Sequence, residues 1–521
     1  MNSTKCAVLG LIVVSAWACA GKGSVATAPD ESVVQARLAE AESLYLKGCY
    51  VPLKKAFEIY KEIYAKPSLR ERTALPFLKT CLLLSTREKD VHIFDRGMTL
   101  MDTAEAIVKE NRGLARYRPW MEMASFISPP ITGVQRDIEP RFDWVKIMEK
   151  LVAGREALKA EALTDEFLAF LYTGWNCSSA MFQKQPEDPS VLAARFPESI
   201  LLKYQAAICG QVPDRRALEE LAVAEPEFYE ARFHLGELSI REGMVLSAEK
   251  ELLGAYEGIP ESPQVLILLA SVYFATEEYE KGLEFYDKTL AVSPEYRDAL
   301  LGKAVCLASL KRYDESIAVL DRMVALGFWL LGESHYWLAW NKHELGRNAA
   351  ALAEIDQAKG RLPTNSEVFG LSGTVAFELG EMERAEKDFM ESLQYNVSNT
   401  ESLFGLGSLK AKAGQWTESA GFYEKAAGVM DGSIAGVRAK ITEIRASDLC
   451  AERKNRLIQR NELKLRSLLY SRATAYFNAA TGRFNSGDAP GAARLVAMAA
   501  EHPAYKTKAE ELLKKMGMNA G

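Results

Sequence analysis

The sequence predicts an all-α protein: a solenoid of stacked helical hairpins that follows an N-terminal export signal. Two observations predict the solenoid. A small residue recurs every 34 or 35 residues between Pro226 and Met430, and no stretch of the chain alternates between apolar and polar residues as a half-buried strand does. Thirty-four residues hold two helices of three to four turns and two short turns. One such unit cannot bury its apolar face alone, so neighbouring units must stack.

Each unit carries two small residues and one large residue at fixed spacing. The first small residue of the six units is Gly236, Ala270, Ala304, Ala339, Gly373 or Gly407. Twelve residues later come Ala248, Gly282, Ser316, Ala351, Ala385 and Ser419, and four residues after these come Leu252, Tyr286, Leu320, Ile355, Phe389 and Tyr423. Small residues are needed where two helix backbones cross at about 8–10 Å. The pattern therefore places the crossing point of each hairpin at the small residues.

Glycine and proline mark the ends of the predicted helices. Seven residues after the first small position stand Gly243, Gly346, Gly380 and Gly414. Glycine suits the C-terminal turn of a helix because it tolerates the left-handed conformation. Pro260, Pro294 and Pro363 follow the second helix of three units, where proline prevents the helix from continuing.

This pattern resembles the tetratricopeptide repeat (TPR). The signature of that family combines Leu-Gly, a tyrosine, an alanine, an aromatic residue and a proline. Residues that match it include Leu235–Gly236, Leu269–Ala270, Tyr273, Ala248, Tyr286 and Pro294. The third unit departs from it, because Lys303 replaces the leucine and Phe328 replaces the proline. The resemblance implies a right-handed superhelix of hairpins whose first helices line the concave side.

Length and composition fit a soluble, folded repeat protein of several segments. The 521 residues are 48% hydrophobic and 26% charged, and the formal net charge of −6 argues against nucleic acid as the main partner. The predicted segments are a signal peptide (1–20), a flexible tether (21–31), a helical, degenerate TPR-like region (32–225), six TPR units (226–430), a charged basic helix (431–466) and a last TPR-like unit with a capping helix (467–521).

The N-terminus has the character of an export signal. Lys5 precedes an apolar run of 12 residues, Ala7 to Ala18, which is too short to span a bilayer as a mature helix. Ala16-Trp17-Ala18-Cys19 resembles the lipid-attachment motif of bacterial lipoproteins, with Trp17 bulky where a small residue is usual. Two alternatives stay open: lipidation of Cys19, or ordinary cleavage after Ala18 or Ala20. Either predicts an exported protein, in the periplasm or anchored in the cell envelope.

The charged segment near the C-terminus has two interpretations. A break is expected at 431–436, and a helix from Val437 to Arg466 with nine Lys/Arg and four Asp/Glu. This helix is either solvated and held by i,i+4 ion pairs, or it contacts an anionic surface such as lipid headgroups.

The first helices carry an apolar stripe bordered by acids. Positions three before, one after and four after the first small residue share one helical face. The large residues of this groove are Phe233, Ile240, Ile267, Phe274, Leu301, Tyr336, Trp340, His343, Phe377 and Phe404. Six positions before the small residue stand Glu230, Gln264, Asp298, Glu333, Glu367 and Glu401. The groove predicts a protein partner whose segment has apolar anchors and Lys or Arg. The alternative is that these residues pack against the next hairpin.

Sequence motifs of catalysis are missing. The chain has no HExxH, GxSxG, Walker or dinucleotide-binding motif, and its five histidines show no metal-ligand spacing. We therefore expect no enzyme activity, no cofactor and no metal. A competing hypothesis places a small-ligand pocket in residues 117–188, with Trp120, Trp144 and Trp175, and makes the protein a ligand-binding component of an envelope transport or sensing system.

Two cysteine pairs have nearly the spacing of one repeat. Cys49/Cys81 and Cys177/Cys209 are each 32 residues apart. In an oxidising compartment both pairs could form disulfides, and otherwise they are buried free thiols. The spacing alone leaves both alternatives open.

Overall fold

The computed structural model describes residues 31–86, 91–123, 149, 152–178, 188–209, 212–327 and 331–518. In these ranges every regular element is a helix, which confirms the all-α prediction. None of the helices there combines the length and apolar character needed to cross a bilayer. The predicted signal peptide with Cys19, the tether up to residue 30, and Trp144 lie outside the described residues.

The N-terminal helices share one hydrophobic core. They are α1 (Glu31–Leu46), α2 (Tyr50–Tyr64), α3 (Arg70–Ser85), α4 (Val91–Glu110), α5 (Arg118–Met123), α7 (Arg155–Ala162) and α8 (Glu166–Ser178). Phe77, Trp120 and Trp175 are among the largest side chains buried in this core. Three further helices lead into the repeats: α9 (Ser190–Arg195), α10 (Ile200–Ile208) and α11 (Arg215–Ala224).

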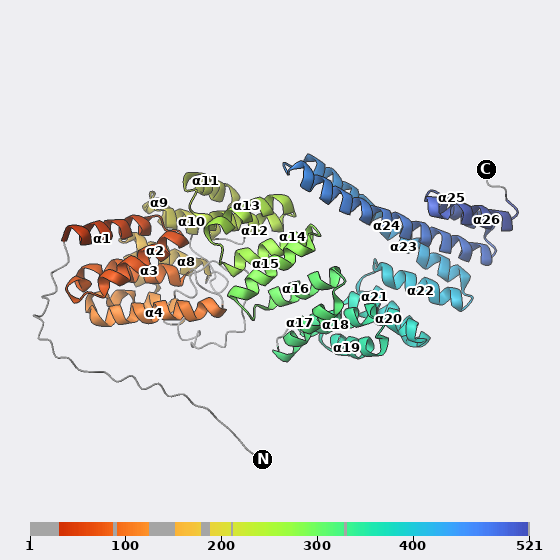
Figure 1. Ribbon diagram of the computed structural model, residues 1–521, viewed down its shortest axis with the longest axis horizontal. Coiled ribbons are helices and arrows are strands. Elements are labelled where there is room, and N and C mark those ends of the chain that lie inside the picture. The colour runs from red at the N-terminus through yellow and green to blue at the C-terminus, as the bar shows by residue number, and fades with distance from the viewer. Residues whose placement is uncertain are drawn as a thin grey trace, which may run out of the picture.

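Six helical hairpins follow, which we number units 1 to 6 (Figure 1). Units 1 to 3 are α12 (Tyr229–Arg241) with α13 (Val245–Gly258), α14 (Pro263–Ala275) with α15 (Tyr279–Val292), and α16 (Arg297–Ser309) with α17 (Tyr313–Ala325). Units 4 to 6 are α18 (Leu331–Glu344) with α19 (Asn348–Arg361), α20 (Ser366–Leu379) with α21 (Met382–Tyr395), and α22 (Thr400–Lys412) with the start of α23 (Trp416–Ala446).

The large residue of each unit occupies the space that the first small residue leaves. A Cβ added to Gly373 would lie 2.4 Å from Phe389, and one added to Gly236 would lie 2.6 Å from Leu252. The second small residue faces the same crossing from the other helix. Where it is serine, its hydroxyl donates to the carbonyl of the first: Ser316 to Ala304 and Ser419 to Gly407, both at 2.8 Å. The spacing in the sequence thus encodes the contact between the two helices.

The turn between the two helices is left-handed in all six units. Gly243, Gly346, Gly380 and Gly414 have φ between 69° and 84°. The equivalent residues of units 2 and 3 are Glu277 (φ 61°) and Lys311 (φ 60°), the only non-glycine residues with positive φ in the described ranges. Side chains are strained in this conformation, so these two turns differ from the other four.

The C-terminal helices differ from the prediction. Helix α23 runs without a break through 431–436 and ends at Ala446, and α24 (Ala451–Asn485) begins after a turn at 447–450. The expected single basic helix over 437–466 is therefore wrong. Buried Ile434, Val437, Ile441 and Ile444 face α24 at the alternating spacing of three and four residues of a coiled coil. The stabilisation from this packing exceeds the destabilisation of the helix by Gly432 and Gly436, which is about 1 kcal/mol for each glycine.

The pair α23–α24, which we call the long hairpin, extends from unit 6 back towards units 1 and 2 (Figure 1). The C-terminal part of α24 also packs on α25 (Ala489–Ala500), and α26 (Lys506–Lys515) closes the chain's last apolar cluster. The long hairpin therefore serves both as the end of the solenoid and as an arm that spans it.

Candidate functional site

Most of the predicted groove residues line the first helices as half-buried side chains. Nine of the ten have intermediate exposure: Ile240, Ile267, Phe274, Leu301, Tyr336, Trp340, His343, Phe377 and Phe404. Phe233 is the exception and a correction, because it is 4% exposed and belongs to the core of units 1 and 2. A half-buried side chain is anchored by its neighbours and still offers one surface to a partner.

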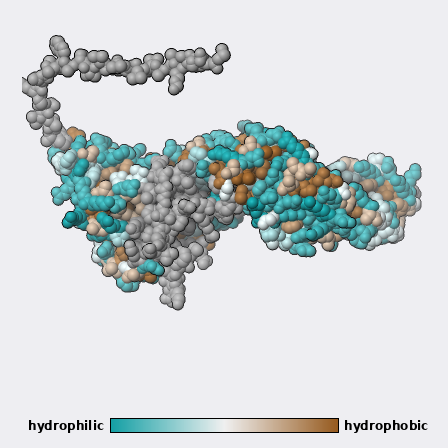
Figure 2. All heavy atoms as spheres, turned by 90° about the horizontal axis from the view of Figure 1, so that it is seen from below, coloured by the Kyte–Doolittle hydropathy of each residue, from teal (hydrophilic) through white to brown (hydrophobic). Residues whose placement is uncertain are grey.

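The aromatic groove residues are densest in unit 4. The Trp340 ring packs edge-on against Tyr313 and Trp337, with centroids 5.8 Å and 5.7 Å apart. Tyr336 packs edge-on against Trp337 at 5.4 Å. Figure 2 shows apolar side chains gathered near the middle of the long axis, where Figure 1 places units 3 to 5. Rigid aromatic side chains of this kind are typical anchors at protein interfaces.

Four of the rim carboxylates have no cationic partner. In the described part of the chain, no Lys, Arg or His nitrogen lies within 4 Å of Asp298, Glu333, Glu367 or Glu401. Elsewhere many carboxylates are paired, for example Asp287 with Lys303 at 2.6 Å and Asp356 with Arg384 at 2.6 Å. The first helices of units 3 to 6 thus carry a row of carboxylates that form no ion pair in the described structure.

Glu230, the remaining rim carboxylate, is used inside the fold. Its Oε1 accepts the backbone N–H of Tyr50 at 3.1 Å, at the first residue of α2. Lys47 pairs with Glu227 beside it. These contacts join the α1–α2 turn to unit 1, so Glu230 is a structural residue and not part of an open rim.

Glu401 and Asp298 are the two acids of the rim whose pKa is raised above its ordinary value, in both cases mainly by burial. The Thr374 hydroxyl donates to Glu401 Oε1 at 2.6 Å. The side chain of Glu401 reaches solvent, but the surrounding protein removes much of the water that would stabilise its negative charge. This desolvation, with a smaller repulsion from Glu367, raises the pKa of Glu401 above its ordinary value. Burial and the same two carboxylates raise the pKa of Tyr336. A cationic side chain of a partner, placed between Glu367 and Glu401, would therefore be stabilised by both carboxylates.

Basic side chains near the groove are few and already engaged. His343 Nδ1 lies 3.0 Å from Asn348 Oδ1 and 3.7 Å from Glu378. The Lys412 ammonium lies 4.1 Å from the centre of the Phe377 ring. Neither one lies within ion-pair distance of the acidic row, although His343 partly offsets the rise in the pKa of Glu401.

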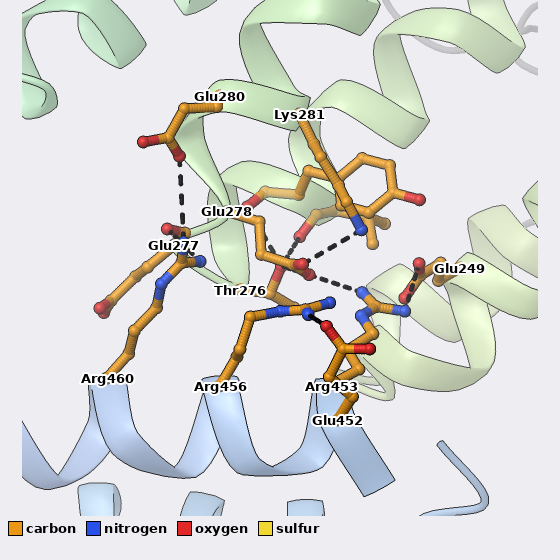
Figure 3. Close-up of polar contacts among 12 residues, drawn as sticks. Glu249, Thr276, Glu277, Glu278, Glu280, Lys281, Glu452, Arg453, Arg456 and Arg460 are labelled. Carbon is orange, nitrogen blue, oxygen red and sulfur yellow. Dashed lines mark hydrogen bonds and ion pairs between the residues drawn. The ribbon is translucent and has the colours of Figure 1, made fainter. Parts of the chain in front are cut away.

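A second polar site, absent from the sequence predictions, joins the long hairpin to units 1 and 2 (Figure 3). The guanidinium of Arg453 lies between two carboxylates, 2.6 Å from Glu249 of α13 and 2.6 Å from Glu278 of the α14–α15 turn. The three side chains are 11%, 3% and 6% exposed. We call this contact the Arg453 junction.

The mutual contacts of the junction favour its charged form. Burial tends to raise the pKa of Glu278, but hydrogen bonds from Arg453 and the nearby Lys281 ammonium outweigh it and lower that pKa. Burial likewise opposes the charge on Arg453, while its bonds to Glu249 and Glu278 raise its pKa. At neutral pH Arg453 and Glu278 are therefore both ionised.

Three further basic side chains of the long hairpin surround the junction. Lys464 Nζ lies 2.7 Å from a Glu277 carboxylate oxygen, and Arg460 donates to the Glu277 carbonyl at 2.9 Å. Lys440 of α23 donates to the Ala275 carbonyl at 2.8 Å. These cations lie at the C-terminal end of α14, where they stabilise the helix dipole. The basic segment thus contacts an anionic surface of its own chain.

The competing pocket hypothesis receives no support from the two tryptophans that are described. Trp120 and Trp175 are 0% and 1% exposed and lie inside the N-terminal core. No group of three or more potential metal ligands occurs in the described ranges.

The cysteine pairs behave differently from one another. Cys177 near the end of α8 forms a disulfide with Cys209 after α10, with Cα atoms 5.3 Å apart. Cys49 and Cys81 are buried free thiols, and Cys450 is exposed. The disulfide alternative therefore holds for Cys177/Cys209, and the alternative of buried free thiols holds for Cys49/Cys81.

Comparison with known proteins supports the repeat assignment. Residues 267–327 match the family model of the tetratricopeptide repeat, and such repeats are generally non-catalytic scaffolds that bind proteins. Human protein O-mannosyl-transferase TMTC1 is 23% identical over 172 residues, which cover 32% of this chain and 19% of that protein. The chain thus spans about a fifth of the length of this curated relative.

Several solved structures are similar to this chain. A tetratricopeptide repeat protein from Parabacteroides merdae is 16% identical with a TM-score of 0.36, over 52% of this chain and 96% of that one. PilF of Pseudomonas aeruginosa is 19% identical with a TM-score of 0.35, over 38% and 89%. PilW, a type IV pilus biogenesis factor, is 21% identical with a TM-score of 0.34, over 39% and 96%.

The six hairpins, their period and the family match over residues 267–327 together show that the chain contains a solenoid of tetratricopeptide repeats.

Proposed function

We propose that this protein is a non-catalytic scaffold of the bacterial cell envelope that binds a basic, apolar segment of a partner protein along the first helices of units 3 to 6. The observation that carries the proposal is the row of carboxylates at Asp298, Glu333, Glu367 and Glu401 with no cation within 4 Å among the described residues. Uncompensated like charges repel each other and destabilise the free protein. A partner's Lys or Arg side chains would relieve that repulsion.

The apolar floor supports the same occupant. Trp340, Phe377 and Phe404 lie on the same first helices as Glu333, Glu367 and Glu401, and they keep part of their surface open. A segment with apolar anchors spaced between basic residues would contact both features at once. Because charge complementarity gives register and apolar burial gives affinity, this arrangement fits an extended or helical peptide better than a small molecule.

The proposed location rests on the N-terminal sequence and receives support from the disulfide. Structural disulfides form in oxidising compartments and are rare in the bacterial cytosol. The Cys177–Cys209 pair is therefore consistent with export, and Cys19 is the proposed site of a lipid anchor. The transferase activity in the name of the human relative is not part of the proposal, since the shared region covers only a fifth of that protein.

Defined peptide pools test the groove before the partner itself is identified. One pool of labelled twelve-residue peptides combines Lys and Arg with Leu and Phe, a second replaces the basic residues by Asp and Glu, and a third replaces Leu and Phe by Gly and Ser. Fluorescence anisotropy would measure binding. We expect the basic–apolar pool to bind best, and Glu367→Gln/Glu401→Gln to weaken it roughly 3- to 30-fold, as two partly exposed ion pairs imply.

The matched control is Glu257→Gln/Asp321→Asn, which removes two exposed carboxylates from the second helices α13 and α17. It should leave binding unchanged. Equal binding of the acidic pool, or equal loss in both double variants, would show that the acidic row does not select the partner.

A further inference from the structure

The long hairpin ties the two ends of the proposed groove together. It leaves the solenoid at unit 6, of which α23 is the second helix, and it contacts α13 and the α14–α15 turn in units 1 and 2 through the Arg453 junction. The four uncompensated carboxylates belong to units 3, 4, 5 and 6 (Figure 1). The part of the groove with free charge is therefore the part that the hairpin spans.

A helical hairpin packed along its length is a stiff element, whereas a solenoid is held only by contacts between neighbouring units. The apolar seam of Ile434, Val437, Ile441 and Ile444 gives the long hairpin this stiffness. A stiff arm fixed at units 1–2 and at unit 6 sets the distance between them. That distance determines the curvature of units 3 to 5 and thereby the shape of the groove.

The contact at units 1 and 2 is polar rather than apolar. In the described part of the chain, the hydrophobic cluster of units 1 and 2 includes no side chain of α23 or α24. Arg453, Arg460, Lys464 and Lys440 meet carboxylates and helix-end carbonyls instead. The buried Nε of Arg453 has no hydrogen-bond partner, so its removal from water is not fully compensated. A contact of this kind is specific, and the aromatic ring that Arg453 covers directly is Tyr273, 5.8 Å from the guanidinium, so its separation would expose little apolar surface.

Backbone strain is also placed at this contact. Glu277 holds the left-handed position that glycine occupies in four other units, and both its carboxylate and its carbonyl bind α24. Strain that persists at a contact point is often linked to the function of that contact.

We propose that the long hairpin is a releasable brace, held by the Arg453 junction, which keeps units 3 to 6 in the curvature that receives the partner segment. This inference rests on the proposed function for its groove, but the brace itself is testable in the free protein. A partner that binds a pre-shaped groove loses less conformational entropy, so docking of the hairpin and binding of the partner favour each other. The coupling is reciprocal: binding of the partner increases the docking equilibrium constant of the hairpin by the same factor by which docking increases the affinity for the partner.

Spin-label distances test the brace directly. Labels on Arg445→Cys of the hairpin and Glu284→Cys of α15 would report their separation by double electron–electron resonance, in the full chain with Cys6, Cys19 and Cys450 replaced by serine. We expect one narrow distance distribution in the parent, and a broad one in Arg453→Ala. The control Arg456→Ala removes a guanidinium one turn away whose ion pair among the described residues is with Glu452 of its own helix, and its distribution should stay narrow.

Affinity for the basic–apolar peptide pool tests the coupling. Arg453→Ala should weaken binding about fivefold or more, the lower range of allosteric couplings, while Arg456→Ala should not. If Arg453→Ala loses helical circular dichroism, Arg460→Ala/Lys464→Ala takes its place, because these two residues are more exposed and bind Glu277 of the α14–α15 turn and Glu280 at the start of α15.

The possible results separate the brace from the proposed function. Identical narrow distributions in the parent and in Arg453→Ala would overturn the brace and leave the groove untouched. Broadening without a change in peptide affinity would overturn the coupling. If the parent binds no peptide pool at all, the proposed function fails and the distances alone decide whether the hairpin is held by Arg453.

Discussion

The ammonium group of Lys464 lies 2.7 Å from the carboxylate of Glu277, a residue 187 positions earlier in the chain. Glu277 has a left-handed backbone conformation, and the equivalent position is occupied by glycine in four of the other five units. Lys311 holds the same conformation in unit 3, is exposed, and makes no side-chain hydrogen bond or ion pair in the described structure. The same strain is thus associated with a long-range contact in one unit and with none in the next.

This difference predicts that substitution by glycine stabilises the protein more at Lys311 than at Glu277. Lys311→Gly should stabilise the protein by about 0.5–1 kcal/mol, because left-handed side-chain strain of about 1–2 kcal/mol is removed and partly offset by the greater freedom of glycine when unfolded. Glu277→Gly should give less or no stabilisation, since the Lys464 contact is lost. Denaturant unfolding of both variants measures the two effects. A larger gain for Glu277→Gly would mean that its contact with Lys464 contributes nothing.

The close approach at the helix crossing gives a second prediction. Gly373→Ala would place a methyl group 2.4 Å from the Phe389 ring, and overpacking of this kind costs about 1–3 kcal/mol. Gly428→Ala in α23 meets nothing within 4 Å and should stabilise by about 0.5–1 kcal/mol, as alanine does in an open helix position. Thermal unfolding followed by circular dichroism distinguishes them. Equal shifts in the same direction would contradict the assignment of Gly373 to a crossing point.

These two cases show why the repeats were predictable. The period fixed which residues are small, which are large and where the chain turns, and each of these rules corresponds to one contact within a unit. Gly373 and Phe389 are only 16 residues apart, so the contact between them recurs at the same spacing in every copy. The groove stripe followed from the same period, apart from Phe233 in unit 1, whose surroundings include α2 residues from outside the repeats.

The Arg453 junction was not predictable in this way. Its carboxylates, Glu249 and Glu278, come from two different units and lie 175 or more residues before Arg453. No repeat spacing links them to Arg453. The apolar spacing of Ile434, Val437, Ile441 and Ile444 was a usable signal for a continuous packed helix. Gly432 and Gly436 concealed it, because local propensity suggests a break there and only the packing of α24 removes it.

The disulfide predicts a difference among the cysteines. Cys177→Ser/Cys209→Ser should lower the free energy of unfolding of the N-terminal region by about 3–4 kcal/mol, the value expected when a closed loop of this size is released in the unfolded chain. Cys450→Ser, which changes an exposed free thiol, should have little effect. Alkylation of the native, unreduced protein followed by mass spectrometry provides the check. Among the described cysteines we expect rapid modification of Cys450 alone, and modification of Cys177 would contradict the pairing.

The junction should weaken in acid. Because Arg453 and Lys281 lower the pKa of Glu278 in the folded protein, the ionised carboxylate stabilises the docked hairpin at every pH above the unfolded value of about 4.3. This stabilisation is lost as the pH falls through the lower value of the folded state. The distance distribution between Arg445→Cys and Glu284→Cys should stay narrow from pH 8 to about 5 and broaden below about pH 4. In Glu278→Gln it should already be broad at neutral pH, and a narrow distribution there would show that Glu249 alone holds Arg453.

Glu401 gives the opposite relation between charge and stability. Its pKa is raised by the surrounding protein and by Glu367, so the ionised carboxylate destabilises the free folded protein at neutral pH, and Glu401→Gln should stabilise it. The same change should weaken binding of basic peptides, because it removes a negative charge from the acidic row. In the parent, affinity should begin to fall at a pH above the ordinary glutamate value of about 4.3, and Glu401→Gln should lose this early part of the pH dependence. Asp321→Asn, on the second helix of unit 3, should change neither property. A variant that gains stability and loses affinity would indicate that Glu401 is retained for a partner's positive charge, whereas losses of both would make it a structural residue.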